Sequence, residues 1–224
     1  VFAPNTFTYF CAFKDITSIV QATGNGTYTL SNLDISPFEI LHNTRKTNFA
    51  GWAILIIYQN DALPLNQLNI YDGLQGVPDN LQIDLTNLYV LDNSDATAGF
   101  IAWEGDRFIQ ESERLSFSAN SVTNVLSNPL NPSNNAFNGT NTETNATNLY
   151  NMDLDVYSIE NYIVPGTTSA TVSLQSAQDY VMLNTVVTKL NSQLPDATIV
   201  LENPTSTCNS REVTLDFTVS NLNS

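Results

Sequence analysis

Apolar and polar residues alternate in short runs along most of this chain, and turn residues separate the runs. The run at 6–13, TFTYFCAF, alternates in the way expected of a β-strand with one buried face. The run at 50–59, AGWAILIIYQ, is apolar on both faces and predicts a central strand covered on two sides. Trp52 in that run, and Trp103 in a later one, are therefore expected in the core.

The rest of the chain extends the same pattern. The run at 67–71 is expected to be the antiparallel neighbour of the run at 50–59. No window of useful length has the period of a helix, so we predict an all-β architecture. Further runs with the character of strands lie at 81–91, 99–103, 115–122, 150–159, 170–174, 180–190 and 197–201.

The number and spacing of these runs predict the fold class. About ten short strands in roughly 200 residues fit two packed antiparallel sheets, a β-sandwich of the jelly-roll or lectin-like kind. We expect this domain to span 1–201 and 202–224 to be a linker and the first strand of a following module. Leu215, Phe217 and Val219 alternate there, but about twenty residues cannot bury a core of their own.

The charge balance limits the possible partners. Charged residues make up only 13% of the chain, and 22 acidic against 7 basic residues give a net charge of −15 at pH 7. So acidic a chain has no basic surface for phosphate backbones, which excludes nucleic acid and anionic membranes as primary partners. No run approaches the ~20 apolar residues of a membrane span, and no leader precedes Val1. A mature, exported fragment that does not insert into a membrane is expected.

Acidic and amide side chains offer one candidate metal site. We expect the apolar residues of 150–156 to face inward, which would place Asn151, Asp153 and Asp155 together on the outer face, close enough for one cation. Asp72, beside a glycine, offers a comparable oxygen ligand in a turn. Oxygen ligands of this kind suit calcium. The alternative is that these residues cap turns and solvate an exposed face.

A long polar tract offers a candidate ligand site. Residues 127–148, SNPLNPSNNAFNGTNTETNATN, exceed the ~12–15 residues beyond which structureless loops become uncommon, so the tract is either functional or disordered. Sandwich lectins bind sugars through loop amides and carboxylates with an aromatic platform. The candidate ligand-binding residues are Asn134, Asn135, Phe137, Asn138 and Asp106.

Catalytic motifs are not found in the sequence. There is no GxSxG elbow, no HExxH helix and no glycine loop for phosphate, and His42 lies in a polar loop. Paired carboxylates such as Glu111 and Glu113 are suited to a glycosidase, but solvated charges are their more ordinary role. We therefore expect a protein that is not an enzyme.

Several ordered motifs resemble a repeated domain of large extracellular adhesins. Such adhesins occur on Bacteroidota, including gliding-motility adhesins exported by the type 9 system, and on some Gram-positive surfaces. The closing CNSREVTLDFTVSNLNS is similar to the start of the Ig-like repeats that follow this domain. The motifs that carry the resemblance are YFCAFKDITSIV (9–20), GNGTYTLSNL (24–33), FAGWAILIIYQNDALPLNQLNIYDGL (49–74), WEGDRFIQESERLSF (103–117), VLSNPLNPSNNAFN (125–138), YNMDLDVYSI (150–159) and PGTTSATVSL (165–174).

The resemblance implies a place and a role, and it supplies no catalytic residues. It implies an extracellular location on the bacterial cell surface, attached to the outer membrane, and a non-catalytic module that mediates attachment or builds a surface filament used in gliding. The expected partners are surface glycans, other extracellular matrix, or neighbouring modules of the same chain. The alternative interpretation is a calcium-assisted, lectin-like carbohydrate-binding domain.

Overall fold

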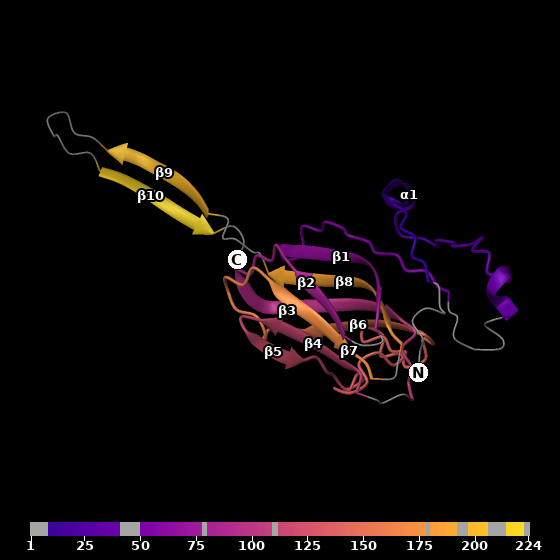
Figure 1. Ribbon diagram of the computed structural model, residues 1–224. Coiled ribbons are helices and arrows are strands. Elements are labelled where there is room, and N and C mark those ends of the chain that lie inside the picture. The colour runs from indigo at the N-terminus through magenta and orange to yellow at the C-terminus, as the bar shows by residue number, and fades with distance from the viewer. Residues whose placement is uncertain are drawn as a thin grey trace.

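The chain folds mostly as two packed four-stranded antiparallel sheets (Figure 1), so the prediction of an antiparallel β-sandwich is confirmed at that level. The computed structural model describes residues 9–40, 50–77, 80–108, 112–177, 180–191, 197–205 and 214–221. Within these ranges no helix is long and apolar enough to cross a membrane.

The strands of the two sheets come from both halves of the sandwich sequence, so neighbours in space are mostly distant along the chain. Sheet I has the order β1-β8-β3-β6, built from β1 (Asn66–Gly76), β8 (Met182–Asn191), β3 (Asp92–Trp103) and β6 (Met152–Ser158). Sheet II has the order β2-β7-β4-β5, built from β2 (Asn80–Leu85), β7 (Ala170–Gln175), β4 (Arg114–Ala119) and β5 (Val122–Val125).

The core lies between the two sheets and is filled by every second residue of the strands. Phe117 on β4 is fully buried and pairs across sheet II with Val172 on β7. On sheet I, Phe100 meets the rings of Phe137 and Tyr157 edge-on, with centroids 6.4 and 5.8 Å apart. Edge-on packing is a favoured geometry of buried aromatic rings. Buried residues alternate with less buried ones along β3 and β7, as in strands with one inner face.

The C-terminal residues form a separate pair of strands. β9 (Ala197–Thr205) and β10 (Thr214–Asn221) pair antiparallel in a sheet of two strands. The strand expected near the C-terminus is confirmed as β10, but residues 202–204, expected to be a linker, belong to β9. The division of the chain into a sandwich and a following module stays a prediction.

The N-terminal part differs from the expected strands. Residues 6–8 of the run at 6–13 lie outside the described part. Residues 9–13 have no regular structure, and Phe10 and Phe13 are exposed. Two short helical segments follow, α1 (Thr17–Thr23) and η1 (Ser36–Phe38), where only strands were expected. None of the residues of α1 is buried, so this helix has no buried apolar face that the sequence pattern could reveal.

The run at 50–59 is not a core strand, and its prediction is wrong. These residues are extended without strand pairing, and Trp52 is 49% exposed. A turn closed by the N–H of Leu63 and the carbonyl of Asn60, 3.0 Å apart, leads into β1. β1 pairs with β8 instead, and two complete sheets fill the sandwich without this run. A run that is apolar on both faces is expected to be buried, but its pattern does not specify which strand pairs with it.

Trp103 also lies outside the core. It is the last residue of β3, on the outer face of sheet I, where it is only partly buried. Its indole N–H donates to the side-chain oxygen of Asn184 over 3.4 Å. Its ring lies so close to Gly51 that a Cβ at that glycine would overlap it. Only a glycine at position 51 therefore allows this approach.

Candidate functional site

The two aspartates of β6 face the inside of the sandwich. Asp153 and Asp155 are both fully buried, whereas Met152 and Leu154 are partly exposed. The expectation that these aspartates lie on the outer face is therefore wrong. Alternation shows which residues share a face, but not which face is buried. The register decides it, because Asp155 stands opposite the core residue Phe100 on β3, and residues directly opposite in a pair of strands share a face.

Asp153 is held by the backbone of the Asn-rich tract. Its Oδ1 accepts the N–H groups of Asn138, Gly139 and Thr140, at 2.9, 2.8 and 2.9 Å. Its Oδ2 is buried and has no hydrogen-bond partner among the described residues. A carboxylate that accepts several backbone N–H groups stabilises the turn that supplies them. Asp153 therefore fixes the tract on the end of the sandwich.

Glu113 and Asp155 extend this network. Glu113 is fully buried, and its Oε1 accepts the N–H of Phe137 at 2.5 Å. The hydroxyl oxygen of Thr140 lies 2.6 Å from Oδ1 of Asn131 and 3.2 Å from Oδ1 of Asp155. Four successive backbone N–H groups, 137 to 140, thus end on two buried carboxylates. The tract is folded onto this cluster rather than disordered, and its role as a functional loop stays a prediction.

Burial changes the acidity of the two aspartates. It raises the pKa of Asp153 to about 7, against the opposing effect of the three backbone N–H groups. Burial likewise raises the pKa of Asp155 to about 6. The pKa of Tyr157 is raised by its own burial and by the nearby charges of Asp155 and Asp153.

These pKa values predict that the chain is more stable at pH 5 than at pH 8. The unfolded chain releases both protons near the ordinary pKa of 3.8, whereas the folded chain holds them to about 6 and 7. The folded state binds more protons in this window, so the free energy of unfolding falls as pH rises, by about 1.4 kcal/mol per pH unit for each group until the pH reaches the pKa of that group in the folded chain. Urea unfolding at pH 5, 6, 7 and 8 measures it, and a rise in stability toward pH 8 would contradict it.

A pocket of about 320 Å³ opens above this cluster. Amides and hydroxyls make its polar wall, prolines and a leucine make its apolar wall, and one arginine lines it. The lining residues are Arg107, Pro129, Leu130, Pro132, Asn135, Asn138, Thr140 and Thr147. The volume lies within the range of roughly 300–1,000 Å³ that is usual for small-molecule sites.

The two asparagines of the pocket are fixed by their amide nitrogens. Nδ2 of Asn138 donates to the carbonyls of Leu130 and Asn135, at 3.0 and 3.2 Å. Nδ2 of Asn135 donates to the carbonyl of Arg107 at 3.2 Å. Oδ1 of each asparagine is buried and has no hydrogen-bond partner among the described residues. Two residues that line the pocket therefore each hold a buried acceptor without a donor among the described residues.

The other predicted ligand-binding residues lie outside the pocket. Phe137 is fully buried against Phe100, so it serves the core and cannot be a platform under a sugar. Asn134 and Asp106 are exposed and do not line the cavity, although each directly precedes a lining residue in the sequence. The structure thus brings together Asn135 and Asn138 of the five.

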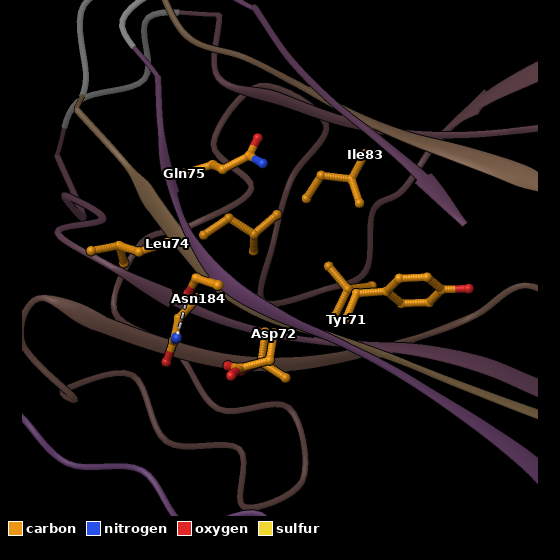
Figure 2. Close-up of a pocket in the computed structure, with 10 residues that line it drawn as sticks. Tyr71, Asp72, Leu74, Gln75, Ile83 and Asn184 are labelled. Atoms are coloured by element: carbon orange, nitrogen blue, oxygen red, sulfur yellow. Dashed lines mark hydrogen bonds between the residues drawn. The ribbon is translucent and has the colours of Figure 1, made fainter. Parts of the chain in front are cut away.

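The four predicted metal ligands are not brought together. Asp153 and Asp155 are inside the sandwich, and Asn151 precedes β6 and accepts the backbone N–H of Glu104 with its carbonyl, at 2.8 Å. Asp72 is exposed on β1 beside a separate, smaller pocket of about 80 Å³ (Figure 2). Across the residues that the structure describes, no three His, Cys, Asp or Glu side chains are placed to hold a metal ion.

Sequence reasoning missed the apolar wall and the arginine. Pro129, Leu130 and Pro132 belong to the repeated Asn-Pro pattern of the tract, which is a signal for consecutive turns. Arg107 comes from the loop after β3 and meets the tract only in space. The sequence predicts a solvated charge at Glu113, and no feature of the neighbouring residues indicates that this side chain is buried.

Comparison with family models finds no match, and comparisons with curated proteins and with solved structures find no significant match.

Proposed function

We propose that this chain is a non-catalytic module of a bacterial cell-surface adhesin, and that its pocket binds surface glycans. The observation that carries the proposal is that Asn135 and Asn138 line a pocket and that Oδ1 of each is buried without a hydrogen-bond partner among the described residues. A buried acceptor without a partner loses about 1–3 kcal/mol, so a ligand that supplies O–H donors at this place is favoured.

The walls of the pocket suit a sugar ring. Saccharides carry hydroxyls that donate to amide oxygens, and the exposed hydroxyl of Thr147 can both donate and accept. The C–H face of the ring can pack against Pro129, Leu130 and Pro132. Among the residues that the structure describes, the lining side chains include no carboxylate, whereas hydrolysis of a glycoside ordinarily needs two that flank the bond. Binding without turnover therefore fits the pocket best.

The adhesin context rests on the sequence. The resemblance of its motifs to extracellular adhesin repeats and the acidic, amide-rich composition support a place outside the cell, on the surface. In that setting the module attaches the cell to glycans or to other extracellular matrix, or contributes to a filament used in gliding by contact with neighbouring modules. A β-sandwich with a ligand site in its loops is a suitable scaffold for either task.

Calcium-assisted binding is the second candidate, and one observation favours it. Oδ2 of Asp153 is buried without a hydrogen-bond partner among the described residues, and Oδ1 of the same carboxylate accepts the backbone N–H of the pocket residue Asn138. Calcium takes six to eight oxygen ligands, so a site here would combine the buried carboxylates with amide oxygens and with hydroxyls of the bound sugar. Asp72 and Asn151 take no part in such a site.

A glycan array, with and without a chelator, tests both candidates. We expect selective binding to a subset of glycans, and at least tenfold weaker binding by Asn135→Leu, which corresponds to about 1.4 kcal/mol. Thr147→Val removes an exposed hydroxyl at the pocket and should weaken binding without unfolding the chain. Asn134→Leu is the matched control, since it makes the same change one residue away and outside the pocket.

Each outcome of the array decides one point. Blank arrays with a folded chain, or equal losses in Asn134→Leu and Asn135→Leu, would overturn the proposed function. Binding that survives complete removal of metal would overturn the calcium-assisted candidate alone.

A further inference from the structure

The pocket has an unusual charge for this chain. Of its described lining residues only Arg107 is charged, in a chain with a net charge of −15. The carbonyl of Arg107 accepts Nδ2 of Asn135 at 3.2 Å, so the backbone of the arginine is tied to the pocket wall. The guanidinium lies over the ring of Phe108, 5.7 Å from its centroid. A cation held on an aromatic face keeps its hydrogen-bond donors free for another partner.

We propose that this pocket selects acidic saccharides, whose carboxylate pairs with Arg107 while neighbouring hydroxyls donate to Asn135 and Asn138. The inference rests on the proposed function, because it names the class of saccharide that the same site takes. A guanidinium matches a carboxylate with two parallel N–H···O bonds, which gives both affinity and direction. The two amide oxygens can only accept, so they recognise hydroxyls and not the acid group.

The buried acids below the pocket do not oppose an acidic ligand strongly. Asp155 lies behind Thr140, whose hydroxyl stands between it and the cavity. Oδ1 of Asp153 is covered by three backbone N–H groups. Arg107 is therefore the charge that an entering ligand meets, while the acidic exterior repels polyanions that do not fit the site.

Titration calorimetry with paired ligands tests the inference. The ligands are short uronate oligosaccharides of the galacturonate, glucuronate, mannuronate and guluronate series, each beside its neutral methyl ester, together with a sulfated neutral oligosaccharide. We expect at least one uronate to bind tenfold or more tightly than its ester. Arg107→Gln should lower the affinity for that acid to about the level of the ester.

Arg114→Gln is the matched control, because it removes the same charge from an exposed position at the start of β4, outside the pocket. Arg107→Lys keeps the charge but not the paired geometry, and it should retain only part of the preference. Equal affinity for acids and esters, unchanged by Arg107→Gln, or a preference for sulfate over carboxylate, would overturn this inference and leave the proposed function standing. Absence of binding to any saccharide, acidic or neutral, would overturn both.

Discussion

Replacement of Phe117 by alanine is expected to lower the free energy of unfolding by about 3–5 kcal/mol. Phe117 is fully buried in the middle of β4, between the two sheets. Removal of its ring leaves a cavity that the paired strands on both sides prevent from closing. Urea unfolding, with an unchanged dependence on denaturant concentration, measures the loss.

Trp52→Ala is the matched comparison for this prediction. Trp52 is 49% exposed in a segment without strand pairing, so its loss should cost only about 1 kcal/mol or less. The sequence pattern alone predicts the reverse, since it places Trp52 in a central strand. A loss at Trp52 as large as the loss at Phe117 would therefore contradict the structure and favour the pattern.

The two variants mark the limit of what alternation can predict. Where only one face of a strand is apolar, as at Leu115 and Phe117 or at Val172 and Leu174, the pattern identifies the inner face, and these side chains are buried. The run at 50–59 has no polar face, so its pattern carries no information about which partner covers it. The sheet neighbours of such a run depend on distant strands, here β8 beside β1.

The sequence predicts which residue types make up the candidate site, but it does not predict how the fold brings them together. The excess of amides in 127–148 indicated a ligand site, and Asn135 and Asn138 do line the pocket. Their orientation depends on Glu113 and Asp153, which are far away along the chain. The sequence pattern placed the aspartates of β6 on the outer face because charged residues are rarely buried. Donors supplied by the tract offset that cost, and only the fold brings them there.

Asp153→Ala is expected to be the most damaging single change at the site, with a loss of about 3–5 kcal/mol at pH 8. The substitution leaves the N–H groups of Asn138, Gly139 and Thr140 buried without their acceptor. An unsatisfied buried donor costs about 1–3 kcal/mol, so three of them exceed the cost of an ordinary cavity. Because those N–H groups belong to the pocket wall, the variant should also lose glycan binding.

Asp153→Asn separates the acceptor from the charge. The amide keeps one oxygen for the three N–H groups, and its NH₂ group takes the place of Oδ2. Because the acceptor for these three donors is kept, we expect a change of about 1 kcal/mol or less at pH 8 with ligand binding retained.

The same variant should flatten the pH dependence of stability, because it removes the group whose pKa burial raises to about 7. Between pH 6 and 8 the wild-type chain loses stability by ionising Asp153, and the amide cannot ionise. Urea unfolding of wild type, Asp153→Ala and Asp153→Asn at pH 6 and 8 measures all three effects together. If Asp153→Asn were as unstable as Asp153→Ala, the negative charge itself would be required. If a chelator then caused the same loss of stability in the wild-type chain, a bound cation would explain the buried cluster better than the backbone donors alone.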